Sequence, residues 1–142
     1  MNLDSIYTDL IAEQSRNTAN KHPLKAPTIT LKGRNPSCGD EINLELQVEN
    51  GVIADASFTG VGCAISQAST SMMIDLIRGE TVEKARHLIE LFLGMIKREI
   101  TDEAVLEELD EAIALKNISN MPARVKCAVL SWHTLDEALQ KE

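Results

Sequence analysis

The sequence has few aromatic residues and fewer basic than acidic ones. Its 142 residues include two phenylalanines, one tryptophan and one tyrosine, so the core has to be aliphatic and no aromatic platform exists for stacking exposed bases. Lysine and arginine total 14 against 22 acidic residues, and the resulting formal charge of −8 argues against a phosphate-binding face. We therefore expect no nucleic acid partner.

Long apolar runs are also missing. No stretch approaches the roughly 18 consecutive apolar residues that a membrane span requires. The first residues, Met1–Asp9, lack the basic start and apolar run of a secretion signal. We expect a cytoplasmic protein with no membrane partner, and a chain of this length predicts a single domain with one core.

Cysteine is scarce, with Cys38, Cys63 and Cys127 alone. An odd number of cysteines without a secretion signal argues against a disulfide framework. No two of them form a Cys-x-x-Cys pair, so a metal or redox site has to be assembled by folding distant segments together.

Alternating apolar and polar residues predict a β-hairpin over 42–58, and a shorter strand is expected over 28–32. A two-residue Asn50-Gly51 loop would split the apolar residues of the hairpin between the two faces of the sheet. A three-residue loop over 49–51 unites them by opposing Ile42 to Phe58. We therefore predict the three-residue loop, with Gly51 in the left-handed conformation.

Helical periodicity appears on both sides of this hairpin. Most helices follow the strands, which predicts an α+β fold: a three-stranded antiparallel sheet with helices packed on one face. The expected helices are 3–16, 65–78, 82–96 capped by Thr81, 101–115 capped by Thr101, one starting at Pro122, and a last short one opened by a capping box of Thr134 and Glu137.

The predicted hairpin brings two cysteines to one end of the sheet. If Asp40 opposes Gly60, Cys38 and Cys63 leave the sheet together with Asp40 between them. Cys63 also begins a helix, where unpaired N–H groups and the helix dipole favour a thiolate. Taken singly, a cysteine is more often a small buried hydrophobe and Asp40 a turn residue. Their combination favours a metal or sulfur site.

The third cysteine, Cys127, points about 150° away from the core stripe of its predicted helix, so it faces something other than that core. Two cations, Arg124 and Lys126, lie within one turn of it, and Lys32 and Arg34 precede the first cysteine. Cations beside thiols stabilise thiolates and offset accumulated negative charge.

Other candidates for chemistry are weaker. The three histidines lie in a polar loop, off a core stripe and before a helix cap, and none is expected to be catalytic. The small residues after Cys63 have no histidine or aspartate at nucleophile spacing, so they predict close helix packing. They are Ser66, Ser69, Thr70 and Ser71.

Three motifs together resemble the IscU/NifU-N family of iron-sulfur cluster assembly proteins. They are Asn35-Pro-Ser-Cys-Gly-Asp40, Thr59-Gly-Val-Gly-Cys-Ala-Ile-Ser-Gln-Ala-Ser69 and Pro122-Ala-Arg-Val-Lys-Cys127. The resemblance implies one IscU-like domain over 1–142 with the IscU/SufE-like sandwich fold, and a branch-specific helical insertion at about 100–118. It makes four residues the ligands of one exposed metal or cluster site, namely Cys38, Asp40, Cys63 and Cys127.

Two features resemble the SufU branch of that family. Lys126 stands where scaffold-type members have a histidine, and those members lack the long segment that here separates Cys63 from Cys127. The SufU resemblance implies bound zinc, acceptance of persulfide sulfur from a SufS cysteine desulfurase, and transfer to the SufBCD machinery. The chaperone-recognition segment of scaffold members is only partly matched over 121–126, so a dedicated chaperone is not implied.

Three thiolates and one carboxylate would saturate a tetrahedral zinc ion and give a formal charge of about −2, which Arg124 and Lys126 could offset. We hypothesise that Cys38 leaves zinc when a desulfurase ligand replaces it, and then accepts the sulfur. One alternative is an IscU-type scaffold that builds a [2Fe-2S] cluster on the same four residues, with Asp40 as the weaker oxygen ligand. Another alternative is a structural zinc domain that serves as an adaptor.

Overall fold

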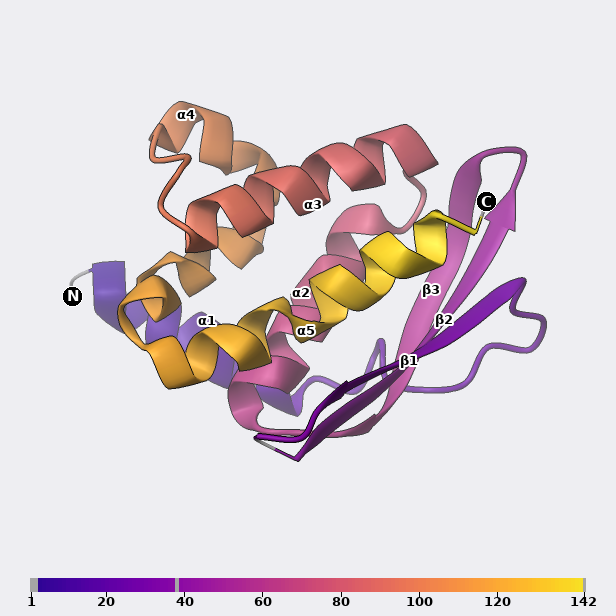
Figure 1. The fold of residues 1–142 in the computed structure, drawn as a ribbon, viewed down its shortest axis with the longest axis horizontal. Coiled ribbons are helices and arrows are strands. Elements are labelled where there is room, and N and C mark those ends of the chain that lie inside the picture. Colours follow the sequence, from indigo (N-terminus) through magenta and orange to yellow (C-terminus); the bar gives the residue numbers. More distant parts are fainter. Residues whose placement is uncertain (1–2, 38, 142) are drawn as a thin grey trace.

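A computed structural model of the chain describes residues 3–37 and 39–141 (Figure 1). Its strands form one antiparallel sheet in the order β1-β2-β3, and the helices lie on one side of it, which confirms the predicted α+β class. The elements are α1 (Leu3–Arg16), β1 (Ile29–Asn35), β2 (Asp40–Glu49), β3 (Val52–Val61), α2 (Ala64–Ile77), α3 (Val82–Ile96), α4 (Glu103–Leu106), the 3-10 segment η1 (Glu107–Asn120) and α5 (Pro122–Leu139).

The apolar residues of the central strand β2 face the helices. Ile42, Leu44, Leu46 and Val48 are buried, while the residues between them are partly exposed, as the alternation predicts. Helix α5 lies over β1 and β2, α2 lies beside it and reaches β3, and α3 packs against α5 farther from the sheet (Figure 1). The core therefore lies between the sheet and this helical layer.

The hairpin has one buried face, as predicted, but its loop and register differ from the prediction. Its loop has two residues, Asn50 and Gly51, with φ of 53° and 77°, as a type I′ turn requires. The three-residue loop was therefore a wrong prediction. The apolar sets are reunited by a β-bulge, because Val48 pairs with Ile53 and Gln47 with Asp55, which leaves Ala54 as an extra residue.

The bulge also changes the pairing farther along the hairpin. Ile42 pairs with Gly60 rather than with Phe58. The carboxylate of Asp55 accepts a hydrogen bond from the backbone N–H of Ala56 at 2.8 Å and from Arg78 at 3.0 Å. An arginine at the end of α2 thus supports the bulge in β3.

Several helix boundaries agree with the sequence pattern and some do not. Helix α3 begins after Thr81, whose side chain accepts a hydrogen bond from the N–H of Lys84, as expected. The expected helix over 101–115 is instead the short α4, capped by Asp102 rather than by Thr101, followed by η1. Within η1, Asp110 has φ of 48°, so the segment is kinked there and cannot continue as one α-helix.

The separate last helix was also a wrong prediction, because α5 is continuous from Pro122 to Leu139. Thr134 does not cap a new helix. Its hydroxyl donates to the carbonyl of Leu130, one turn earlier in the same helix, at 2.8 Å.

The core is largely aliphatic, with one aromatic pair where helices meet. The rings of Phe92 in α3 and Trp132 in α5 stack with centroids 4.1 Å apart. The indole N–H of Trp132 donates to Ser69 of α2, whose hydroxyl donates to the carbonyl of Ala128. Small residues of α2 thus allow the close packing expected of them. Within the described residues, no helix combines the length and the apolar character that a membrane crossing demands.

Candidate metal centre

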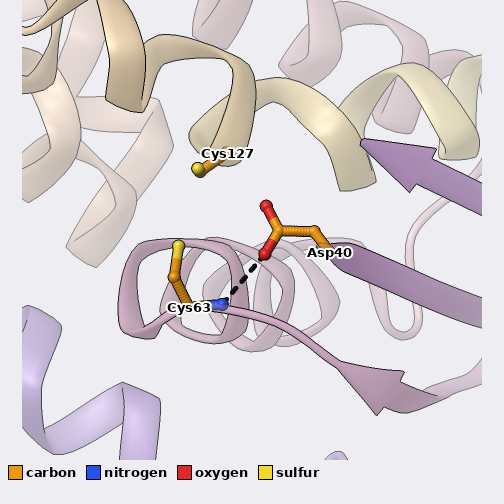
Figure 2. A group of neighbouring side chains, drawn as sticks. All are labelled: Asp40, Cys63 and Cys127. Carbon is orange, nitrogen blue, oxygen red and sulfur yellow. Dashed lines mark hydrogen bonds between the residues drawn. The ribbon is translucent and has the colours of Figure 1, made fainter. Parts of the chain in front are cut away.

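The first residue of β2, Asp40, places a buried carboxylate at the end of the sheet. Its side chain is only 2% exposed. One oxygen, Oδ1, accepts a hydrogen bond from the backbone N–H of Cys63 at 2.9 Å (Figure 2). The other oxygen, Oδ2, is buried and has no hydrogen-bond partner within residues 3–37 and 39–141. A buried carboxylate oxygen without a partner is costly, which makes it a candidate for binding a cation.

Cys63 lies at the junction between β3 and α2, as the sequence predicts. It is the N-cap residue of α2, is partly buried, and makes no side-chain capping hydrogen bond. Because its thiol is not used for capping, the sulfur is available to the space in front of Asp40. Figure 2 shows the sulfur of Cys63 next to the carboxylate of Asp40, in the space between β2 and α5.

Cys127 reaches the same place from α5. It is 1% exposed and lies outside the continuous hydrophobic cluster that contains its neighbour Ala128. Its sulfur points toward Asp40 and Cys63 (Figure 2). The ligand atoms of the three residues all lie within 4.8 Å of one another. The helical phase of Cys127 therefore predicted its direction correctly.

These three donors fit a zinc ion or an iron-sulfur cluster. A tetrahedral zinc ion with bonds of about 2.0–2.3 Å holds its ligand atoms roughly 3.3–3.8 Å apart, so a small closure of the observed group is sufficient. Thiolates favour zinc and iron-sulfur clusters, and a carboxylate oxygen is a common companion ligand. The partnerless Oδ2 of Asp40 gives this fit an observation that is independent of the cysteines.

The predicted fourth ligand and sulfur acceptor, Cys38, lies outside the described residues. It falls in the connection between β1, which ends at Asn35, and β2, which begins at Asp40. Asn35 and Asp40 pair directly across the sheet. The assignment of Cys38 as a ligand therefore stays a prediction.

The predicted supporting cations divide into two groups. Arg124 and Lys126 are exposed on the first turns of α5, near Cys127 in the sequence. Lys32 and Arg34 instead form ion pairs with Glu41: Nζ of Lys32 lies 3.0 Å from Oε1, and Nε of Arg34 lies 3.7 Å from Oε2. A hydrogen bond and the charge of Lys32, with a smaller effect from Arg34, lower the pKa of Glu41 below its ordinary value. Lys32 and Arg34 therefore pair with a carboxylate on the exposed face of the sheet and not with the cysteines.

The sequence analysis missed several polar residues at this end of the sheet. Buried side-chain atoms without a hydrogen-bond partner occur at Asn35, Ser66, Gln67 and Ser131. Ser66 and Gln67 follow Cys63 by three and four positions, the spacing that brings helix residues to one face. That spacing indicates that Ser66 and Gln67 lie on the same face of α2 as Cys63, whereas the sequence pattern predicted only close packing for Ser66.

Comparisons with known proteins agree with this geometry. The family model described as "NifU-like N terminal domain" matches residues 6–141. A protein of Thermotoga maritima named "Iron-sulfur cluster assembly scaffold protein IscU" is 44% identical over 96% of this chain and 94% of its own length. A Bacillus subtilis protein named "Zinc-dependent sulfurtransferase SufU" is 38% identical over 99% of this chain and 94% of its own length.

A solved structure gives the same result for the fold. A protein of Fervidobacterium islandicum AW-1 described as "Putative iron-sulfur cluster assembly scaffold protein for SUF system (FiSufU)" superposes with a TM-score of 0.87 and 36% sequence identity. The match covers 97% of this chain and 99% of that one. This chain therefore belongs to the NifU-like N-terminal domain family of iron-sulfur cluster assembly scaffold proteins, which includes IscU and SufU.

Proposed function

We propose that this protein is a SufU-type, zinc-bound acceptor of persulfide sulfur. In this proposal a SufS-like cysteine desulfurase supplies the sulfur in the cytoplasm, and a SufBCD-type complex receives it. The observation that carries the proposal is the convergence of Asp40, Cys63 and Cys127, whose ligand atoms lie within 4.8 Å of one another. The named zinc-dependent sulfurtransferase among the relatives and Lys126 before Cys127 support the zinc-bound reading.

Three described residues and Cys38 would hold the metal. When bound, zinc would keep the cysteines as thiolates and limit their oxidation. Asp40 would contribute Oδ2, since Oδ1 is already engaged by the N–H of Cys63. One oxygen of the carboxylate thus accepts a hydrogen bond, and the other would coordinate the metal.

In the proposed transfer, Cys38 is the nucleophile. Its thiolate attacks the outer sulfur of the cysteine persulfide on the desulfurase. The sulfur–sulfur bond of the donor breaks, the donor cysteine leaves as a thiolate, and a new sulfur–sulfur bond leaves the persulfide on Cys38. No net oxidation or reduction occurs, so the step needs no additional redox partner.

The exposed cations of α5 have a supporting role in this proposal. Three thiolates and a carboxylate concentrate negative charge, and Arg124 and Lys126 are placed in the sequence where they can offset it. Their exposure also leaves them accessible to an acidic surface on a partner.

The first experiment is to measure the metal content and the visible spectrum of protein purified without added metal. We expect about one tightly held zinc ion per chain and no colour. Iron with sulfide and a brown chromophore would favour the scaffold function instead. A folded protein that binds no metal would contradict the assignment of the site.

The second experiment tests sulfur acceptance with a cysteine desulfurase and mass spectrometry of the trapped persulfide. The Cys38→Ser variant should lose the added sulfur and no longer stimulate the desulfurase. Ser37→Ala is the matched control, because it alters the same segment but keeps every thiol. Undiminished acceptance by Cys38→Ser would contradict the proposal, and no stimulation by the wild-type protein would favour a structural zinc domain.

The second candidate function is a scaffold on which a [2Fe-2S] cluster is assembled from the same four residues. The named scaffold proteins among the relatives favour it. A hard carboxylate ligand at Asp40 suits release of a cluster, because oxygen binds iron-sulfur iron less well than thiolate does. Lys126, in place of the histidine of scaffold-type members, is the feature against it.

A further inference from the structure

Two buried polar side chains on the first turns of α2 each have an atom without a hydrogen-bond partner among the described residues. They are Ser66, which is 1% exposed, and Gln67, which is 8% exposed. The partnerless atoms are the hydroxyl oxygen of Ser66 and the amide nitrogen Nε2 of Gln67, and both can donate hydrogen bonds. Buried polar groups are satisfied in the great majority of cases, so two neighbouring exceptions indicate that a partner is to be found.

Gly62 shows what these two atoms surround. A Cβ atom at this position would lie 2.8 Å from Oδ1 of Asp40, 3.1 Å from Oγ of Ser66 and 3.3 Å from Nε2 of Gln67. The three polar atoms therefore border one small space that exists because residue 62 has no side chain. Oδ1 of the carboxylate borders that space, and the sulfur atoms of Cys63 and Cys127 lie near the same carboxylate (Figure 2).

We propose that Ser66 and Gln67 are positioning residues for Asp40, the side chains that hold its carboxylate with Oδ2 directed at the metal. The inference rests on the proposed metal site. Oδ1 already accepts from the N–H of Cys63 and has further acceptor capacity. Small rotations bring the hydroxyl of Ser66 and the amide of Gln67 to that oxygen, directly or through one water molecule in the Gly62 space.

This arrangement would set how strongly Asp40 binds the metal. Outer partners of metal ligands orient those ligands, and their loss typically weakens metal binding by about 10- to 100-fold. With Oδ1 held by donors, the carboxylate is limited to binding through one oxygen. Without them it can rotate within the site, and Oδ2 is no longer fixed.

The test uses three variants and measures zinc affinity by competition with a chromophoric chelator. Ser66→Ala removes the hydroxyl, and Gln67→Met removes the amide at similar volume. We expect the double variant to bind zinc about 10-fold or more weakly than the wild type. The matched control is Ser57→Ala, because Ser57 is also a buried serine with a partnerless hydroxyl but lies farther back on β3, opposite Glu45. It should bind zinc as the wild type does.

A second measurement separates positioning from a general loss of stability. The thermal midpoints of the metal-free variants should equal or exceed that of the metal-free wild type, because removing a buried polar atom that lacks a partner breaks no hydrogen bond. The same two changes in an Asp40→Ala background should no longer alter zinc affinity, since their effect passes through that carboxylate. An equal loss of affinity in the Asp40→Ala background would overturn the inference.

Gly62→Ala approaches the same space from the opposite direction. The added methyl group displaces the carboxylate or the donors, so zinc affinity should fall although no polar group is removed. The outcomes also distinguish this inference from the proposed function. A wild-type protein that binds no zinc would overturn both, whereas a wild-type protein that binds zinc with an affinity unchanged in all these variants would overturn only the inference.

Discussion

The two ends of the sheet are finished in opposite ways. At the end that holds the Asn50-Gly51 turn, the hairpin is tied to the helices by backbone hydrogen bonds. Ile53 donates to the carbonyl of Glu80 at 2.8 Å and accepts from the N–H of Gly79 at 2.7 Å. The N–H of Val82, at the start of α3, donates to the carbonyl of Gly51 at 2.9 Å. We call this the closed end.

At the other end, which we call the site end, buried polar atoms lack partners. Among the described residues, six buried side chains have a polar atom without a hydrogen-bond partner. Of these six, only Ser57, in the middle of β3, lies away from the site end. The rest are at the junctions of β1 with β2 and of β3 with α2, and one turn beyond Cys127 on α5; they are Asn35, Asp40, Ser66, Gln67 and Ser131.

The contrast indicates which end is built for stability and which for a ligand. Unsatisfied buried polar atoms cost free energy, roughly 1–3 kcal/mol each, so a fold retains a group of them only where something else compensates. The comparison therefore predicts that changes at the closed end alter folding and leave the metal, while changes at the site end do the reverse.

The largest expected effect is at the closed end. Ile53→Ala truncates a fully buried side chain and should lower the free energy of unfolding of the metal-free protein by about 2–5 kcal/mol. Its zinc affinity, measured on the folded protein, should remain that of the wild type. Urea unfolding checks the first expectation. Val61→Ala is the control, because this exposed valine should contribute within about 0.5 kcal/mol. A matching loss of zinc affinity would break the comparison.

The next effect is at the site end. Asp40→Ala should weaken zinc binding by about 10- to 100-fold, measured by chelator competition. The metal-free variant should unfold within about 1 kcal/mol of the wild type, because losing the hydrogen bond from Cys63 is offset by removing a partnerless buried oxygen. Asp40→Asn keeps an acceptor for Cys63 but removes the charge, and it should also bind zinc weakly. Wild-type affinity in both variants would refute the role of Asp40.

A smaller effect is expected at the turn itself. Gly51 has φ of 77°, so Gly51→Ala should cost about 1–2 kcal/mol of stability. Gly51→Asn should cost less, because asparagine tolerates the left-handed region better than alanine. Thermal unfolding of the two variants side by side gives the measurement. Equal losses would indicate that the contacts of the turn, not its backbone conformation, determine its stability.

The smallest effect concerns the exposed charges that join η1 to α3 beyond the closed end. A hydrogen bond from Lys84, aided by His87, lowers the pKa of Glu108 below its ordinary value. A carboxylate with a lowered pKa stabilises the fold above its ordinary pKa, and that contribution is lost as the pH falls through the lowered value.

Wild type and Glu108→Gln should therefore differ slightly in thermal midpoint at neutral pH and converge in acid. The pairs involved are exposed, so high salt should reduce the difference even at neutral pH. A difference that widens as the pH falls would show that the sign of this contribution is wrong.

The sequence was sufficient for the fold class, for the order of the strands and for the buried face of β2, but not for the hairpin loop or for the register of β3. Alternation identified the buried face of β2, the common end of two strands brought Asp40 to Cys63, and helical phase turned Cys127 away from the core stripe of its helix. Each of these inferences uses a local repeat whose direction in space is fixed by backbone geometry. That is why they agree with the structure.

The remainder depends on contacts between distant segments. The bulge in β3 is supported by Arg78 from the end of α2, a partner that no local pattern of the hairpin reveals. Helix α5 is continuous through Thr134, whose hydroxyl bonds backward to Leu130 instead of capping a new helix. The partnerless state of Ser66 and Gln67 is a property of packing, so it cannot be read from residue types.

The extra residue Ala54 has a consequence for the chemistry 9 positions later, at Cys63. Side chains of a strand alternate between faces, so odd and even positions exchange roles at a bulge. Before it Ile53 points inward, and after it Ala56 and Phe58 do. Without the bulge, Ala54 would pair with Gln47 in a regular ladder, which would turn Ala56 and Phe58 toward solvent and shift Cys63 by one residue relative to Asp40. The position of a proposed metal ligand is thus set by its spacing along β3 from the hairpin turn at the far end of the sheet.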